Sequence, residues 1–136
     1  MYKVLLENID LEKLNSELQP LYENKNSGEH IWLQKDYECL LDLPYTNILL
    51  DHLNMFNSRI MTLKGRECYT WHRDQTPRIH IPFITNQSCL FVLEDKSFTL
   101  PQGSAYLIDT TKSHTALNGN KTFLRRHIVG MTNEMV

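Results

Sequence analysis

A His-x-Asp triplet and one distant histidine are the residues of this chain whose types and spacing could do chemistry. His72 and Asp74 stand two positions apart, and His114 follows His72 by 42 positions (114 − 72). Alternate residues at a strand end point the same way, so His72 and Asp74 can reach one metal ion while Arg73 points elsewhere. Two imidazoles and one carboxylate on one face of iron leave three coordination positions open, as in non-haem Fe(II) oxygenases. The pattern therefore predicts an Fe(II) site.

Cationic residues alternate with apolar ones in two later segments. Arg78 and His80 share one face of a predicted strand, and Arg125 and His127 share a face opposite to that of Arg126. Such alternation makes sense in a buried strand if one face lines an anion-binding cavity. The guanidinium fork binds a carboxylate through two parallel hydrogen bonds, so we expect Arg125 to hold the far carboxylate of a dicarboxylic co-substrate. Arg126 is the alternative for that role.

Taken singly, several of these residues also have ordinary structural explanations. A lone His-x-Asp triplet arises often by chance in a solvated turn, and His80 or His127 alone would be a core or rim histidine. Trp71 could simply pack against neighbouring side chains. The order and spacing of all these residues together favour a binding site.

Length and composition predict a single domain over residues 1–136 of a globular protein. The hydrophobic fraction is 41% and the charged fraction 22%, which are ordinary values. The formal charge is −2 and no block of like charges occurs. The chain therefore has no electrostatic footprint for nucleic acid or for an anionic membrane surface.

The cysteines and the lengths of the apolar segments indicate the cellular compartment in which we expect the protein. Cys39, Cys68 and Cys89 form no CxxC pair, and their odd number argues against a disulfide framework. The first residues do not resemble a signal peptide, and no apolar run approaches the roughly 18 residues of a membrane span. We expect a protein of the reducing cytoplasm.

Residues 1–57 are expected to supply helices and strands that support the site. Asp10 can cap a helix whose apolar residues recur at helical spacing, and Pro20 should end or kink that helix. The expected elements are strands over 2–6 and 30–34, a loop over 24–29, and a short buried helix within 46–56, with a strand as the alternative there.

From residue 58 onward the pattern changes to about seven short strands divided by turn residues. The strands are expected over 59–64, 68–72, 78–84, 90–93, 97–100, 105–109 and 122–129. This spacing predicts a mainly β (α+β) fold of the β-sandwich or jelly-roll type, with the N-terminal helices packed on one sheet.

The site residues and the motifs around them resemble the aspartyl/asparaginyl β-hydroxylase family of 2-oxoglutarate oxygenases. The resemblance covers residues 58–130, and residues 1–57 carry no recognisable match. The motifs are Arg59-Ile-Met-Thr-Leu-Lys-Gly, Trp71-His-Arg-Asp, Arg78-Ile-His-Ile-Pro, Gly103-Ser-Ala-Tyr-Leu-Ile-Asp, Ser113-His-Thr-Ala-Leu-Asn and Arg125-Arg-His-Ile-Val.

The resemblance implies a double-stranded β-helix (jelly roll, cupin-like) over residues 58–130 with Fe(II) at its mouth. It also implies hydroxylation by O2 coupled to the conversion of 2-oxoglutarate to succinate and CO2. His72 and His114 match the family's iron histidines, and Arg125 matches its co-substrate arginine. Arg78 and His80 match the pair beside the co-substrate. No catalytic residue beyond the metal ligands is expected.

The substrate is expected to be an amino acid, or an amino-acid side chain in a peptide or protein. Some family members lack a carboxylate ligand, whereas Asp74 is present here, as in bacterial members that act on free amino acids such as proline. Trp71 and Arg73 are expected at the mouth, where they would bind the substrate. Exposed edge strands in so small a barrel are compatible with a homodimer.

Two other readings stay open at this point. A cupin-like protein could hold Zn or Mn for isomerisation, or only for binding, without using 2-oxoglutarate, because a jelly roll hosts many functions. Arg125 and Arg78 on one cavity face argue against it, since an isomerase needs no clamp for a co-substrate carboxylate. A structural or binding jelly roll with solvated polar residues is the second alternative.

Overall fold

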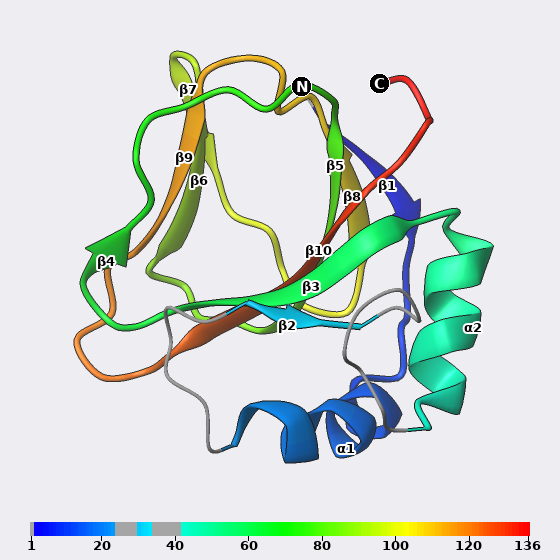
Figure 1. Cartoon of the computed structure of the whole chain (residues 1–136). Helices are drawn as coiled ribbons and strands as arrows, with labels where there is room; N and C mark the ends of the chain where they lie inside the picture. The colour runs from blue at the N-terminus through cyan, green and yellow to red at the C-terminus, as the bar shows by residue number, and fades with distance from the viewer. Residues whose placement is uncertain (1, 24–29, 34–41) are drawn as a thin grey trace.

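The structure is a computed structural model that describes residues 2–23, 30–33 and 42–136. Within these ranges the chain forms two antiparallel sheets that face each other, with two helices outside the larger sheet (Figure 1). Cys39 and the predicted loop at 24–29 lie outside the described residues.

The larger sheet has six strands and the smaller has four. The larger runs in the order β1 (Tyr2–Leu6), β8 (Ala105–Ile108), β5 (Arg78–Ile84), β10 (Arg125–Met131), β3 (Phe56–Leu63) and β2 (Ile31–Trp32). The smaller runs in the order β4 (Glu67–Cys68), β9 (His114–Asn118), β6 (Cys89–Leu93) and β7 (Lys96–Phe98). From β3 onward the chain passes back and forth between the sheets, which is the path of a jelly roll. The predicted fold is confirmed.

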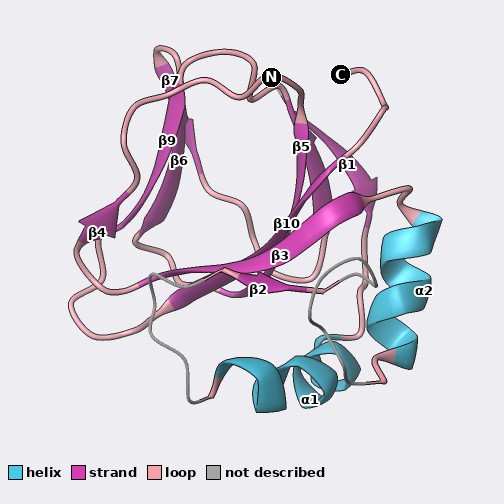
Figure 2. Ribbon diagram, viewed as in Figure 1, coloured by secondary structure: helices cyan, strands magenta, loops and turns pink. Residues whose placement is uncertain are grey.

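The two helices lie on the outer face of the larger sheet (Figure 2). Helix α1 (Leu11–Tyr22) begins at Asp10, whose side chain accepts a hydrogen bond from the Lys13 amide at 3.0 Å. Helix α2 (Pro44–His52) has no side-chain cap of its own. The Glu17 carboxylate of α1 instead accepts from the Tyr45 and Thr46 amides, each at 2.8 Å.

Strand alternation produces two apolar cores with different surroundings. Ile79, Ile81 and Ile128 are fully buried on the side of the helices. Residues next to these isoleucines in sequence point the opposite way, so His80 and His127 face the interior between the sheets. A second cluster there contains Leu63, Phe91, Leu93, Leu100, Tyr106, Ile108 and Ala116. The interior between the sheets therefore holds both apolar and polar side chains.

Several predicted element bounds are wrong in detail. Helix α1 continues two residues past Pro20, to Tyr22. Of the predicted strand at 30–34, the described residues 30–33 form a strand at Ile31–Trp32, and Gln34 lies outside the described residues. The predicted strand at 68–72 is Glu67–Cys68 followed by an isolated bridge at His72. The predicted strand at 122–129 begins at Arg125, because Asn120 Oδ1 holds the Thr122 and Phe123 amides in a turn.

Candidate metal centre and cavity

The structure brings His72, Asp74 and His114 together. Their potential ligand atoms all lie within 4.8 Å of one another. His72 Nε2 is 3.7 Å from Asp74 Oδ1, and His114 Nε2 is 3.5 Å from Asp74 Oδ2. These three residues are hereafter called the triad.

Backbone hydrogen bonds place the triad. The His72 amide donates to the His114 carbonyl at 3.1 Å, and the His114 amide donates to the His72 carbonyl at 2.8 Å. This reciprocal pair sets the two histidines directly opposite each other, with ring centroids 4.3 Å apart. The Asp74 amide donates to the Thr110 carbonyl at 2.8 Å. The main chain therefore fixes all three residues before any metal binds.

The outer nitrogen of each imidazole faces a backbone carbonyl. His72 Nδ1 lies 2.6 Å from the Thr70 carbonyl oxygen, and His114 Nδ1 lies 2.9 Å from that of Lys112. A carbonyl only accepts, so each Nδ1 must carry the proton. Each Nε2 then presents a lone pair toward Asp74, which is the tautomer and orientation that metal ligation requires.

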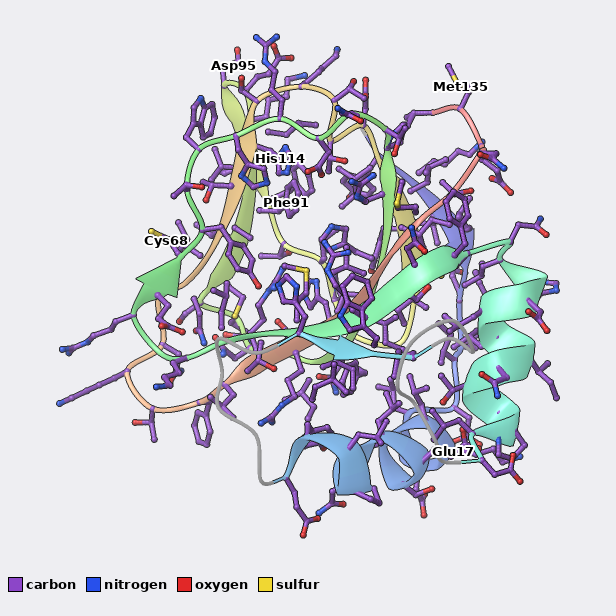
Figure 3. All side chains as sticks on the ribbon, in the orientation of Figure 1. Glu17, Cys68, Phe91, Asp95, His114 and Met135 are labelled. Carbon is purple, nitrogen blue, oxygen red and sulfur yellow. The ribbon has the colours of Figure 1, made fainter. Side chains whose placement is uncertain are left out.

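The electrostatic surroundings keep His114 neutral. Burial lowers the pKa of this imidazole, and the Lys112 carbonyl and the Asp74 carboxylate oppose that effect. The ring also packs flat against Phe91, with centroids 5.6 Å apart and planes 7° from parallel (Figure 3). A neutral imidazole in a fixed orientation is ready to bind a metal without first losing a proton.

The triad is open on one side. The His114 side chain is 6% exposed, that of Asp74 21% and that of His72 39%. The group lies on a cavity of about 420 Å³ whose lining comes from both sheets. The lining residues are His30, Arg59, Met61, Cys68, Tyr69, Thr70, His72, Asp74, Arg78, His80, Phe91, His114, Ala116 and Val129. A metal held there would face a space large enough for small molecules.

Arg78 is the cation beside the triad. Its Nε lies 3.9 Å from Asp74 Oδ2, and its Nη1 donates to the Thr76 carbonyl at 3.0 Å. The guanidinium thus lies beside the Asp74 carboxylate, and both residues line the cavity. This is the place expected of a residue that binds a carboxylate close to the metal.

Arg125 lies deeper, and its charge is buried. The residue is 1% exposed, and its Nη1 and Nη2 have no hydrogen-bond partner within the part of the chain that the structure describes. The Tyr69 side chain is close, with the guanidinium carbon 5.9 Å from its ring centre. Burial lowers the pKa of Arg125, and neighbouring Tyr69 opposes this. A buried guanidinium whose two terminal nitrogens lack hydrogen-bond partners among the described residues is costly, and an anion would offset that cost.

Arg125 does not line the 420 Å³ cavity. It lines a much smaller one, of about 10 Å³, together with His127 and Phe91. Phe91 lines both spaces. Arg126 lies on the other side of the sheet, where its guanidinium sits 4.0 Å from the ring centre of Tyr22 in α1. Of the two arginines, only Arg125 is directed to the interior.

His80 and His127 form a buried pair that joins the two cavities. Their Nδ1 atoms lie 3.1 Å apart, so one ring donates a hydrogen bond and the other accepts it. Burial holds both pKa values well below 6.5, and the charge of Arg125 adds to the effect. His127 was not singled out as a site residue from the sequence, although it shares the face of Arg125.

Trp71 and Arg73 are placed at the surface. Trp71 is 55% exposed, and Arg73 Nε donates to the Ser113 hydroxyl at 3.0 Å. Neither belongs to the described residues that line the cavity. Their role in substrate binding remains a prediction that depends on how far a substrate extends beyond the mouth.

Comparison with known proteins identifies the family. A family model described as aspartyl/asparaginyl beta-hydroxylase matches residues 12–130. The chain belongs to this family. The match begins 46 positions before Ser58 (58 − 12), so the expectation that residues 1–57 carry no match is wrong. That segment contains none of the predicted metal ligands, and its apolar helix pattern is common to many folds.

Two solved structures are similar to this member of the hydroxylase family. AviO1 from Streptomyces viridochromogenes Tue57 has a TM-score of 0.61 at 13% identity, over 99% of this chain and 91% of that one. Protein NMB1881 from Neisseria meningitidis has a TM-score of 0.54 at 14% identity, over 93% and 100%. At such identities the likeness shows the fold alone.

Two further findings bear on the class of protein. No curated protein matches the sequence. Among the helices in the described ranges, none is long and apolar enough to cross a membrane.

Proposed function

We propose that this family member is an Fe(II)- and 2-oxoglutarate-dependent dioxygenase. It would hydroxylate an amino acid, free or within a peptide or protein, and release succinate and CO2. The observation that carries the proposal is the convergence of the His72 and His114 Nε2 atoms on the Asp74 carboxylate. Two imidazoles and one carboxylate are the donors that suit non-haem Fe(II) with open positions.

The surroundings of the two histidines also suit iron, in addition to the types of donor atom. Both Nδ1 atoms face backbone carbonyls, and such outer hydrogen bonds raise ligand basicity and fix ring orientation. When bound, Fe(II) would supply O2 activation coupled to the oxidative decarboxylation of 2-oxoglutarate. The protein supplies the binding geometry and the exclusion of water.

The arginines fit the two carboxylates of the co-substrate. Arg125 would hold the far carboxylate, because its free Nη1 and Nη2 match a fork of two parallel hydrogen bonds. Arg78, beside Asp74, would stabilise the carboxylate close to the metal. His80 lines the large cavity together with Arg78 and contacts His127, which lines the small cavity together with Arg125, and it would contact the co-substrate chain.

The test is an anaerobic titration of Fe(II) and 2-oxoglutarate into the apoprotein. A metal-to-ligand charge-transfer band should appear in the visible only when both are present. The band should be absent in His114→Ala and intact in His52→Ala, which changes an exposed histidine of α2. A substrate screen by succinate release would follow a positive result.

One observation keeps the cupin-like alternative in view. Arg125 lines the small cavity rather than the large one. Tight metal binding without the charge-transfer band would therefore favour a metal protein or isomerase that does not use 2-oxoglutarate. Failure to bind metal would exclude both.

A further inference from the structure

The small cavity beside Arg125 has a positively charged lining. Arg125 lines it together with apolar side chains, among them Phe91 and Leu100. Thr85 adds a hydroxyl and Cys89 a thiol, and both groups can donate a hydrogen bond. None of the described residues that line the cavity is acidic. The cavity therefore presents hydrogen-bond donors and one positive charge, with no carboxylate to balance that charge.

The charge of Arg125 lacks a negative partner among the described residues. Its Nη1 and Nη2 are buried without a hydrogen-bond acceptor there. Burial lowers the pKa of the guanidinium, and Tyr69 and Cys89 oppose this effect without being carboxylates. Burial raises the pKa of the Tyr69 phenol above its usual value of about 10, so this neighbour is neutral at pH 7. These neighbours moderate the charge but do not neutralise it.

The positive charge also acts on His127, which lines the same cavity. Burial is the main cause of the low pKa of His127, and the charge of Arg125 lowers it further. His127 is therefore neutral at pH 7 and adds a polar ring rather than a second charge. An anion in the cavity would face a single cation, so one negative charge is enough to balance it.

The size of the cavity selects the kind of anion. At about 10 Å³, the cavity has room for one particle the size of a water molecule. A halide ion is a single atom of this kind, whereas sulfate, phosphate or a carboxylate group would need the cavity to widen. The cost of removing an ion from water rises as its radius falls, so fluoride is disfavoured in a buried, partly apolar space. Chloride satisfies both conditions.

We propose that this cavity is a chloride-binding site and that the ion neutralises Arg125 while the co-substrate is absent. Chloride accepts hydrogen bonds from the two terminal nitrogens of the guanidinium. Binding of chloride does not depend on the proposed function, but one consequence rests on it. Chloride and the far carboxylate of 2-oxoglutarate would use the same guanidinium, so chloride competes with 2-oxoglutarate.

The first test measures chloride binding directly. The metal-free full chain is added to sodium chloride in buffers without other halides, and the width of the chloride NMR signal is followed. Exchange with a site on the protein should broaden the signal, and bromide but not fluoride should reverse the broadening. The affinity should fall about tenfold or more in Arg125→Met, which removes the charge-assisted hydrogen bonds.

Two variants separate this site from the rest of the surface. Arg126→Met is the matched control, because its guanidinium lies on the helix side of the sheet against Tyr22, and it should bind chloride as the unmodified protein does. Arg125→Lys keeps the charge with a single nitrogen and should retain part of the affinity. Thermal melts check that each variant is folded.

The second test locates the ion without any variant. Crystals of the unmodified protein in sodium bromide should show an anomalous scattering peak within hydrogen-bond distance of Arg125 Nη1 or Nη2. Absence of a peak there would overturn the proposal. Equal broadening of the chloride signal by Arg125→Met and the unmodified protein would also overturn it, because the ion would then bind only to surface cations.

Addition of 2-oxoglutarate separates this proposal from the proposed function. If both are correct, 2-oxoglutarate should reduce the broadening to the level seen with Arg125→Met. Broadening that depends on Arg125 but does not respond to 2-oxoglutarate would support the chloride site and contradict the role of Arg125 in co-substrate binding.

Discussion

At the level of single residues, the buried charge of Arg125 should lower the stability of the folded protein. Arg125 is the largest fully buried side chain, and its terminal nitrogens lack hydrogen bonds among the described residues. Removing a group of this kind often leaves a protein unchanged or more stable, because no ion has to be kept away from water. The same group is what a co-substrate carboxylate would need. The proposed function of Arg125 and the stability of the apoprotein are therefore opposed.

This opposition gives a prediction for Arg125→Met. The free energy of unfolding of the apoprotein should rise by about 1 kcal/mol, since an apolar side chain of similar length replaces a buried cation. The 2-oxoglutarate concentration needed for half-maximal activity should rise at least tenfold, while Fe(II) affinity stays unchanged. Denaturant titration and succinate release measure the two effects.

Arg126→Met serves as the matched control. Its guanidinium lies on the helix side of the sheet, against Tyr22, so co-substrate affinity should not change. If Arg126→Met rather than Arg125→Met weakened 2-oxoglutarate binding, our choice between the two arginines would be wrong.

At the level of elements, strands β5 and β10 carry a histidine pair that makes stability depend on pH. Burial holds the pKa values of His80 and His127 well below 6.5 in the folded state. In the unfolded chain each would bind a proton as the pH falls through about 6.5. The unfolded state then binds more protons than the folded state, so stability is greatest above pH 6.5 and falls with pH below it.

We therefore expect the apoprotein to lose about 1.4 kcal/mol per pH unit for each of these two histidines below pH 6. In His127→Asn the slope should fall by about 1.4 kcal/mol per pH unit, because the contribution of this one histidine is gone. Denaturant titrations at a series of pH values measure it. His52→Gln, which changes an exposed histidine, is the control and should leave the slope unchanged. An unchanged slope in His127→Asn would show that His127 does not contribute to the pH dependence of stability.

Helix α2 depends on a residue of another helix. Glu17 of α1 accepts hydrogen bonds from the amides of Tyr45 and Thr46 and from the Thr46 hydroxyl, and it lies where α1 approaches the start of α2 (Figure 3). It thus performs the task of an N-cap residue, which Leu43 cannot.

Glu17→Ala should lower the free energy of unfolding by about 1–2 kcal/mol, as expected for the loss of a cap with buried amide partners. Urea titration measures this. Glu12→Ala, at an exposed position in the same helix, should cost at most a few tenths of a kcal/mol. Equal effects of the two substitutions would show that Glu17 does not act as a cap.

Local chemistry explains which elements and residues could be predicted. His72, Asp74 and His114 were predicted because metal ligation needs particular residue types at a particular spacing. The face of Arg125 followed from strand alternation alone. Glu17 was not predicted, because its partners Tyr45 and Thr46 meet it only through helix packing. No periodicity in the sequence encodes such contacts.

At the level of the whole molecule, metal binding should be measurable as stability. The triad joins segments that lie far apart in sequence, and an ion that binds only the folded chain stabilises it by mass action. At a metal concentration one hundred times the dissociation constant, the gain should be about 2.7 kcal/mol. Thermal melts with Fe(II) under anaerobic conditions, or with Zn(II), test this.

His114→Ala should abolish the gain, and addition of EDTA should reverse it in the unmodified protein. A gain of equal size in His114→Ala would mean that the metal binds elsewhere. Since His114 also packs against Phe91, the comparison is made between loaded and metal-free forms of each variant rather than between variants.

The reciprocal backbone bridge between His72 and His114 bears on when the proposed iron could be acquired. These histidines are 42 positions apart (114 − 72), and each uses its own amide and carbonyl to hold the other. A chain whose synthesis has not reached His114 carries only two of the three triad residues, His72 and Asp74, and would bind an ion less tightly. If the site holds iron as proposed, stable loading would wait until synthesis has passed His114 and the two segments have paired, so a nascent chain would not carry redox-active metal.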